Sequence, residues 1–361
     1  MQRTLLTVAL SLAALATLLP SKAPVEAQQL AGEWNFLVSG DARNCGDVVM
    51  PGIAATALKR QVAFYWHLGD LRAIANFDED MQHQREHVAK PLGVSEYLTQ
   101  AWPDFIESQI LPFGQIPFLV GIGNHEVVPP KTREEFLAQF ADWLDTPGLR
   151  DQRLKDDPQD HRLKTYYHFV DRGISFYFLD NASNEQFDAT QLRWFERVLT
   201  KDEADPAITT VVAGMHKALP DGYNDHSMNE SATAAEAGRR VYGDLLAAQN
   251  VARKHVYVLA SHQHFYMEDA YDTPYWRSHG GVLPGYVVGT AGAVRYALPT
   301  PSPQVAMTNV YGSLLASVQR GGEIRFRFER LTEADIPPAT TARFGQEFVH
   351  WCFVNNTQVV P

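Results

Sequence analysis

Basic residues are scarce in this chain of 361 residues. Lys and Arg number 31 against 42 Asp and Glu, which gives a formal net charge of −11 at pH 7. Because nucleic-acid backbones and anionic membrane surfaces attract clustered cations, this balance predicts that neither is a partner. The hydrophobic share of 45% and the charged share of 20% are those of a globular protein, which excludes a disordered or fibrous chain.

Long apolar runs are missing beyond the beginning of the chain. After residue 19 no segment approaches 18 uncharged apolar residues, so we expect no later segment to span a membrane. Arg3, the apolar run 5–19 and the small-residue site at 25–27 are typical of a cleaved secretory signal, with a retained N-terminal anchor as the alternative. The segment predicts a secreted or periplasmic protein that has no membrane attachment after cleavage.

Cysteine is nearly absent, since only Cys45 and Cys352 occur. In an exported protein an even pair permits one disulfide, which would bring the C-terminal tail beside the first strand. Two unrelated buried thiols are the alternative, and the sequence leaves the choice open. A Gly-x-Ser-x-Gly nucleophile motif is also absent, which argues against a serine hydrolase of non-phosphate esters.

What the chain does contain is an alternation of short apolar runs with helical patterns. The expected strands are 34–39, 62–68, 117–122, 174–179, 209–213 and 255–260, and the expected helices are 96–111, 133–144, 189–199 and 234–248. Three late runs, 286–288, 312–318 and 324–330, suggest antiparallel structure, and the polar stretch 151–162 suggests an exposed excursion. The pattern predicts an α/β protein in which two sheets pack face to face.

Metal-capable side chains stand at the ends of five of these strands. In chain order they are Asp41, then Asp70, then Asn124 with His125 and Glu126, then His216, and finally His262 with His264. Each alone has an ordinary explanation as a turn, a helix cap or a buried histidine. Ligands of open α/β sheets bind beyond the carboxyl ends of parallel strands. If the strands are parallel, these oxygens and imidazoles meet at one edge and form a site suited to Zn²⁺, Mn²⁺ or Fe.

In this order the motifs resemble the calcineurin-like metallophosphoesterases. The pattern of that family runs Asp-x-His, Gly-Asp-x-x-Asp, Gly-Asn-His-Asp/Glu, an isolated His and Gly-His-x-His. The matching segments here are Asp41-Ala-Arg43, Gly69-Asp70-Leu-Arg-Ala73, Gly123-Asn124-His125-Glu126, His216 and Ser261-His262-Gln-His264. The resemblance covers roughly residues 34–330, and the segment 123–126 is its most specific part.

The resemblance implies an α/β fold, a two-sheet β-sandwich flanked by helices, with one or two divalent metal ions at its edge. It implies that Asp41, Asp70 and His264 hold the first ion, and that Asp70, Asn124, His216 and His262 hold the second, with Asp70 bridging. His125 would face the leaving group without binding metal, and Glu126 would orient His125. We expect residues 1–27 to be the signal peptide, 28–343 the catalytic domain and 344–361 a tail packed on that domain.

Two positions depart from the family pattern. Arg43 stands where the first motif has histidine, and Ala73 stands where purple acid phosphatases, a branch of the family, have an iron-binding tyrosine. A guanidinium offers no lone pair to a cation, so we expect the first metal position to be weak, filled by water or empty. Substitute ligands from Tyr65, His67, Asn76 or Asp78 stay open. Arg43 itself would clamp a phosphoryl group, or pair with a carboxylate of the cluster.

These expectations together predict a secreted metal-dependent phosphoesterase. A metal-bound hydroxide would attack phosphorus in line, Arg43 would neutralise charge, and His125 would assist the leaving group. The substrate would be a small phosphomonoester or phosphodiester. The alternative is a non-catalytic protein that binds metal and a phosphorylated ligand on the same fold. Aromatic residues near the motifs would line the substrate pocket or pack in the core: Tyr223, Phe265, Tyr266, Tyr271, Tyr275 and Trp276.

Overall fold

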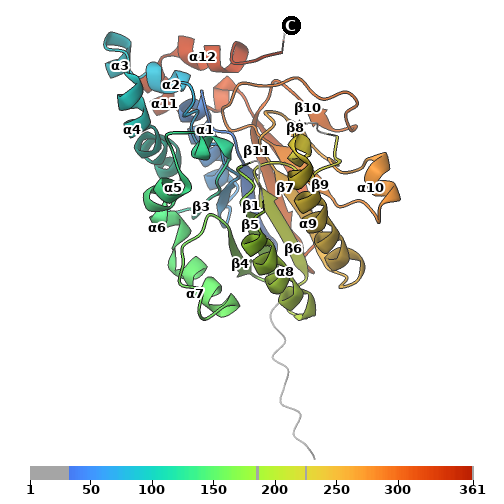
Figure 1. Cartoon of the computed structure of the whole chain (residues 1–361). Helices are drawn as coiled ribbons and strands as arrows, with labels where there is room; N and C mark the ends of the chain where they lie inside the picture. Colours follow the sequence, from blue (N-terminus) through green and yellow to red (C-terminus); the bar gives the residue numbers. More distant parts are fainter. Residues whose placement is uncertain (1–31, 184–186, 224–225, 360–361) are drawn as a thin grey trace, which may run out of the picture. The chain divides into compact units, whose positions relative to one another are not determined.

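The computed structural model describes residues 32–183, 187–223 and 226–359. The expected signal peptide, residues 1–27, lies outside the described residues. Within them the strands form two sheets, one of five strands in the order β12-β11-β1-β2-β3 and one of seven in the order β10-β8-β9-β7-β6-β5-β4. Helices flank the two sheets (Figure 1), so the predicted α/β fold with two stacked sheets is confirmed.

The strands are short, as the apolar runs indicated. The five-stranded sheet contains β1 (Trp34–Ser39), β2 (Tyr65–His67), β3 (Phe118–Val120), β11 (Tyr311–Val318) and β12 (Ile324–Leu331). The seven-stranded sheet contains β4 (Tyr167–Asp171), β5 (Ile174–Leu179), β6 (Thr210–Met215), β7 (His255–Ala260), β8 (Tyr266–Met267), β9 (Gly285–Val288) and β10 (Ala306–Met307).

Strand direction places the polar clusters at one edge. In the first sheet β1 pairs parallel with β2 and β2 with β3, and in the second sheet β5, β6, β7 and β9 form a continuous parallel set. The late strands β11 and β12 are antiparallel to each other, as expected. All five strands that precede a metal-capable cluster therefore belong to parallel sets, and each cluster leaves its strand at the carboxyl end.

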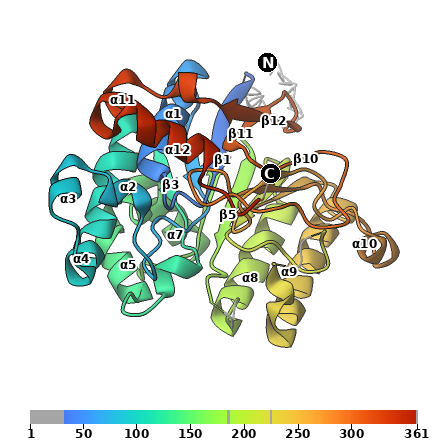
Figure 2. The same ribbon diagram turned by 90° about the horizontal axis from the view of Figure 1, so that it is seen from above.

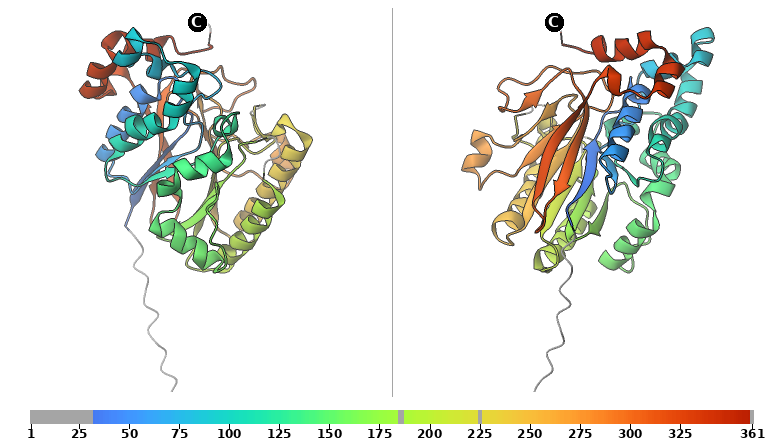
Figure 3. Two further views of the ribbon diagram at one scale, coloured as in Figure 1. Left: turned by 60° about the vertical axis from the view of Figure 1, so that its left-hand side comes forward. Right: turned by 180° about the vertical axis from the view of Figure 1, so that it is seen from behind.

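Helices cover the outer faces of both sheets (Figures 1 and 3). The longer ones are α1 (Gly46–Lys59), α4 (Val94–Phe105), α7 (Pro147–Asp156), α8 (Ala189–Ala204), α9 (Ala232–Asn250) and α12 (Gln346–Val354). The shorter ones are α2 (Glu79–Gln82), α3 (Arg85–Ala89), α5 (Arg133–Gln139), α6 (Ala141–Leu144), α10 (Pro274–Ser278) and α11 (Pro338–Phe344). No described helix is both long and apolar enough to cross a bilayer.

Aromatic side chains fill the space between the sheets. Phe36 of β1 and Phe64, just before β2, each meet the ring of Phe176 from β5 edge-on, with centroids 5.3 Å apart. Trp66 of β2 also points between the sheets, where its ring lies 6.4 Å from that of Phe178. Alternate residues of each strand point to opposite faces, so the same strands also contribute to the outer layers.

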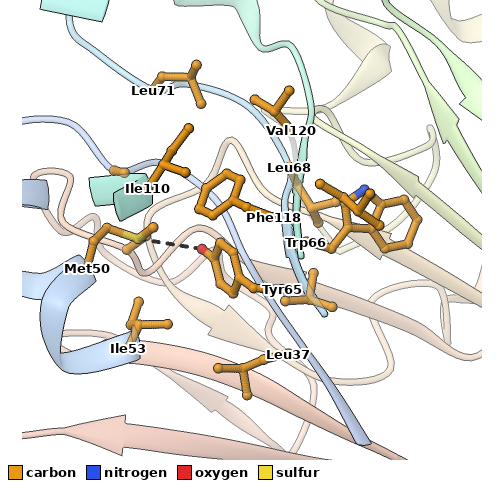
Figure 4. Close-up of a cluster of buried hydrophobic side chains, with 14 of the residues drawn as sticks. Leu37, Met50, Ile53, Tyr65, Trp66, Leu68, Leu71, Ile110, Phe118 and Val120 are labelled. Atoms are coloured by element: carbon orange, nitrogen blue, oxygen red, sulfur yellow. Dashed lines mark hydrogen bonds between the residues drawn. The ribbon is translucent and has the colours of Figure 1, made fainter. Parts of the chain in front are cut away.

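The outer face of the five-stranded sheet packs against α1 and the segment that follows α4 (Figure 4). Tyr65 is fully buried there between strands and helix, and its hydroxyl donates to Sδ of Met50 at 3.5 Å. Phe118 of β3 lies next to it, with ring centroids 5.0 Å apart. Burial of such aromatic side chains stabilises the layer that supports the ends of β1, β2 and β3.

A disulfide joins the two ends of the described chain. Cys45, directly before α1, is bonded to Cys352 in α12 across 307 residues of sequence. Of the two alternatives left by the sequence, the disulfide is the one that forms. Figure 2 shows α12 lying across the same end of the sheets as α1 and α2. The backbone of this tail is held further by Arg295, which donates to the carbonyl oxygen of Phe353 at 2.7 Å.

Two expected elements differ from the structure. The helix expected over 96–111 is an α-helix, α4, only to Phe105 and continues as a π-helical turn, Ile106–Ile110; Pro103, which cannot donate to the preceding turn, lies just before this change. The polar stretch 151–162 begins inside α7, which packs on β4, and only its second half is an irregular excursion.

Candidate metal centre

Five loops, each following a parallel strand, bring the predicted ligand residues together. Asp70, His216 and His262 offer ligand atoms that all lie within 4.8 Å of one another. Nε2 of His216 is 3.0 Å from Oδ1 of Asn124, 3.0 Å from Nδ1 of His262 and 3.3 Å from Oδ1 of Asp70. Donor atoms bound to one ion at about 2.0–2.2 Å lie about 3.0–3.4 Å apart, so this spacing is that of a shared ligand sphere.

The hydrogen bonds of His216 show which of its ring nitrogens is free to bind a cation. Nδ1 of His216 faces the carbonyl oxygen of Leu68 at 3.0 Å, which places the ring proton on Nδ1 and leaves a lone pair on Nε2. That lone pair faces the amide oxygen of Asn124 and the carboxylate of Asp70, which are acceptors as well. Buried acceptors that converge in this way repel one another unless a cation lies between them. These residues therefore fit a divalent metal ion.

The charge states agree with this interpretation. Burial alone would raise the pKa of Asp70, but His216, His125 and Arg43 hold it well below its usual range, so the carboxylate is ionised. Burial lowers the pKa of His262 to about 4, which keeps the imidazole neutral and able to bind a cation. Burial disfavours the charged form of His216, yet the Asp70 carboxylate outweighs it and raises the pKa of His216, so a proton competes with a metal ion for its Nε2. The cluster thus carries negative charge that attracts a cation.

A second group of atoms lies on the other side of Asp70. His264 directs Nδ1 at the carbonyl oxygen of Val294, 2.5 Å away, so its Nε2 carries the lone pair. This Nε2 is 3.2 Å from Oδ1 of Asp41, and the other oxygen of Asp41 accepts from the backbone amide of His262 at 2.6 Å. Within the described ranges, Oδ1 of Asp41 and Oδ2 of Asp70 have no hydrogen-bond partner.

Arg43 lies within this second group. Its Nη2 donates to Nε2 of His264 at 2.7 Å, its Nη1 donates to Nε2 of His125, and its Nε is 3.6 Å from Oδ2 of Asp70. The side chain is 11% exposed. Arg43 is thus paired with the Asp70 carboxylate of the cluster, and its contact with a phosphoryl group stays a prediction.

Close approach of two loops fixes the position of Asp70. Gly69 adopts φ +97°, and a Cβ there would lie 2.5 Å from the backbone nitrogen of Gly123. A Cβ at Gly123 would lie 2.3 Å from Oδ1 of Asp70. Only glycine fits at both positions, which explains why this residue precedes the polar residues in both motifs.

Glu126 has a different partner from the one expected. The sequence suggested that it orients His125, but its carboxylate instead accepts from the backbone amides of Gly123 at 2.7 Å, Leu71 at 2.8 Å and Asp70 at 2.9 Å. It is completely buried and joins the loops after β2 and β3. The ring of His125 is held through Nδ1 by the carbonyl oxygen of Ala73. The sequence could not indicate these contacts of Glu126 and His125, because their partners are backbone amide and carbonyl groups, which nearly every residue type offers.

An open cavity of about 420 Å³ lies over the centre. Arg43, Asn124, His125, His226 and His262 line it, together with residues that sequence reasoning did not assign: Val127, Val128, Ala182, Ser183, Lys217, Glu230 and Tyr296. Lys217 pairs with Glu230 at this wall, and its position directly after His216 is the only signal that could have indicated it. The six aromatic residues weighed as a pocket wall are not among the lining residues.

The side chains considered as substitute ligands for the first position lie elsewhere. Tyr65 bonds Ser39 and Met50 in the core, and His67 packs among aromatic rings, where burial lowers its pKa to about 3. Asp78 accepts from the backbone amides of Asn44 and Ala73, and Asn76 is exposed. Each has a structural role or faces solvent, so none of the four joins the group around Asp41.

Comparison with known proteins finds similarity in structure alone. No family model matches the sequence, and no curated protein matches it. A purple acid phosphatase from yellow lupin (Lupinus luteus) seeds superposes with a TM-score of 0.58 at 15% identity, over 84% of this chain and 52% of that chain. A dimetal phosphatase from Danio rerio gives a TM-score of 0.50 at 13% identity, over 82% of this chain and 95% of that one.

The chain thus spans about half the length of the lupin phosphatase. At these identities the comparison shows the fold, which is that of the calcineurin-like metallophosphoesterases, as the sequence resemblance implied.

Proposed function

We propose that this protein is an exported, metal-dependent phosphoesterase that hydrolyses a small phosphomonoester or phosphodiester. The observation that carries the proposal is the convergence of Asp70, Asn124, His216 and His262 beneath an open cavity. A divalent ion bound there, such as Mn²⁺, Zn²⁺ or Fe, would lower the pKa of coordinated water toward neutrality and supply positive charge to a phosphoryl group. The phosphatase fold of the similar structures supports this reaction class.

The residues of the chain would divide the remaining work. Arg43 contributes a fixed positive charge beside Asp70, where it would stabilise the charge that develops on phosphoryl oxygens. His125 faces the cavity with 17% of its side chain exposed and would serve the leaving group. For that, Nε2 of His125 must carry a proton and must be released from Arg43. Lys217 and Glu230 at the cavity wall would limit the size of the leaving group.

Export is proposed on two grounds. The N-terminal segment has the pattern of a signal peptide, and the Cys45–Cys352 disulfide is a bond that forms and persists in oxidising compartments. The acidic net charge favours a small-molecule substrate over nucleic acid.

One observation favours the alternative of a binding protein without catalysis. In the structure the ring proton of His125 is directed at Ala73, and its Nε2 accepts from Arg43, so the histidine has no proton to give in this arrangement. A protein that only binds a phosphorylated ligand would keep such an arrangement.

The test is hydrolysis of p-nitrophenyl phosphate and of bis-p-nitrophenyl phosphate with Mn²⁺, Zn²⁺ or Fe²⁺, and with a chelator as control. We expect turnover that the chelator abolishes and that the metal restores. Absence of turnover with every metal, together with tight phosphate binding by calorimetry, would establish the binding protein instead.

A further inference from the structure

We propose that the guanidinium of Arg43 takes the place of one of the two metal ions of this fold, so that the centre binds a single divalent ion on Asp70, Asn124, His216 and His262. The inference shares with the proposed function only the need for that one ion. In such a centre the guanidinium of Arg43 supplies one positive charge from the chain itself, and the second cation is a metal ion that can be exchanged.

The contacts of Arg43 carry this proposal. The three ligand atoms available at the first position are Oδ1 of Asp41, Oδ2 of Asp70 and Nε2 of His264. The guanidinium lies against two of them: Nη2 is 2.7 Å from Nε2 of His264 and Nε is 3.6 Å from Oδ2 of Asp70. Oδ1 of Asp41 is 3.2 Å from the same Nε2 of His264.

A metal ion and the guanidinium compete for the same lone pair. Because Nδ1 of His264 is directed at the carbonyl oxygen of Val294, Nε2 has one lone pair, and Arg43 already donates to it. An ion bound to Nε2 would lie at about 2.0–2.1 Å along that direction, which leaves no room for a nitrogen atom of the guanidinium. Two cations at such short range in a buried site also repel each other strongly.

The loop that carries Arg43 is fixed rather than free to swing. The backbone amide of Asp41 donates to the carbonyl oxygen of Gly69 at 3.0 Å, and the amide of Ala42 donates to that of Asp70 at 2.9 Å. On the other side the amide of Asn44 donates to Oδ1 of Asp78 at 2.7 Å, and Cys45 is held by the disulfide. These bonds fix the backbone that carries Arg43 beside the cluster.

The charges also favour one ion. Arg43 carries a positive charge, because a guanidinium stays protonated in proteins. With Asp41 and Asp70 ionised, one divalent ion and the guanidinium leave a charge of one positive unit around the cavity. That surplus suits an anionic phosphoester, whereas a second divalent ion would add two further units in the same small volume.

The experiment counts metal ions in the full-length mature protein. Wild type, Arg43→His, Arg43→Lys and Asp70→Asn are stripped with chelator, loaded with excess Mn²⁺ and desalted. Bound manganese is measured by elemental analysis, and the electron paramagnetic resonance spectrum distinguishes an isolated ion from a coupled pair. Circular dichroism and the cooperativity of thermal unfolding show that each variant is folded.

We expect one ion per chain with the spectrum of isolated Mn²⁺ in the wild type and in Arg43→Lys, which keeps the positive charge. We expect two ions with a coupled spectrum in Arg43→His, which restores the missing imidazole, and fewer than one in Asp70→Asn. Two ions in the wild type would overturn the proposal, and so would a single ion in a folded Arg43→His.

The outcomes separate this proposal from the proposed function. One ion without turnover of any phosphoester contradicts the function and leaves the role of Arg43 supported. Two ions with turnover contradict the role of Arg43 and leave the function supported. No bound ion in the wild type contradicts both.

Discussion

Asp70 lies between the two groups of ligand atoms and is the residue on which metal binding depends most. Its Oδ1 faces His216 at 3.3 Å and its Oδ2 faces Arg43 at 3.6 Å. Asp70→Ala removes the buried carboxylate, so we expect the variant to lose its metal and, with it, hydrolysis. Elemental analysis after gel filtration checks this. Unchanged metal content in folded Asp70→Ala would show that the ligand assignment is wrong.

His125 lies beside the same carboxylate but has no place among the metal-binding atoms. Its Nε2 is 3.8 Å from Oδ2 of Asp70 and its Nδ1 is directed at Ala73. We expect His125→Gln to lower kcat about 10²–10⁴-fold, which is the usual contribution of an acid or base, with metal content unchanged. His161→Gln, which removes an exposed histidine, is the matched control. A loss of metal in His125→Gln would assign the histidine a ligand role instead.

At the scale of single residues the sequence indicated chemistry but not contacts. The types and order of Asp70, Asn124, His216 and His262 predicted a metal centre, and the structure brings these four together. The position of the Arg43 guanidinium could not be predicted, because it depends on the path of a loop whose turns place Asp41 and Asn44 at positive φ. The backbone partners of Glu126 and His125 could not be predicted either, because they too depend on the paths of loops.

At the scale of the elements, the Cys45–Cys352 disulfide links α12 to the start of α1 and stabilises the packing of both helices. A cross-link that closes so long a loop restricts the unfolded chain, and such bonds contribute about 2–5 kcal/mol. We expect the double variant Cys45→Ser, Cys352→Ser to fold, because Asn356 and Arg295 also hold the tail, but to unfold at a lower urea concentration.

Urea unfolding with and without reductant tests this expectation. The reductant should shift the wild-type midpoint to that of the double variant and should leave the variant unaffected. Equal midpoints of wild type and variant without reductant would mean that the bond contributes nothing to the stability of the fold.

The elements also show where hydrophobic patterning succeeds and fails. Strands β1, β5, β6 and β7 are mostly apolar because both faces of their sheets are covered, and the apolar runs located them within about two residues. Helix α1 escaped prediction because nine of its residues are buried, so it has no polar stripe. It also contains Pro51 and lacks a side-chain cap, which removes the usual signals of a helix.

At the scale of the whole molecule, a buried charge cluster joins the layer of helices behind the metal centre. Arg72 is completely buried and pairs with Asp47 of α1 at 2.7 Å, with Asp80 of α2 at 3.1 Å and with Asp104 of α4. Three carboxylates surround one guanidinium, so full ionisation would leave uncompensated negative charge in a buried place. The cluster relieves this by retaining a proton: burial raises the pKa of Asp47 to about 7 and raises that of Asp80 well above its usual range.

This proton makes the stability of the whole fold depend on pH. In the unfolded chain Asp47 releases its proton near its ordinary pKa of 3.8, whereas the folded chain holds it to about pH 7. The contribution of this group to stability is therefore complete below pH 3.8 and is lost as the pH rises to 7. For one proton the slope is at most about 1.4 kcal/mol per pH unit. Asp47→Asn keeps an oxygen acceptor for Arg72 and cannot ionise, so it should remove the part of the slope that Asp47 contributes and leave the part that comes from Asp80.

The measurement is urea unfolding of the wild type and Asp47→Asn between pH 4.5 and 8. Groups away from the cluster titrate alike in both proteins, so the difference in unfolding free energy reports the proton that the neighbouring carboxyl groups of Asp47 and Asp80 hold. We expect the wild type to lose stability relative to the variant as the pH rises toward 7, and the difference to level off above it. Asp142→Asn makes the same change of charge on an exposed helix and should give a smaller slope. Parallel curves for wild type and Asp47→Asn would show that the cluster holds no such proton.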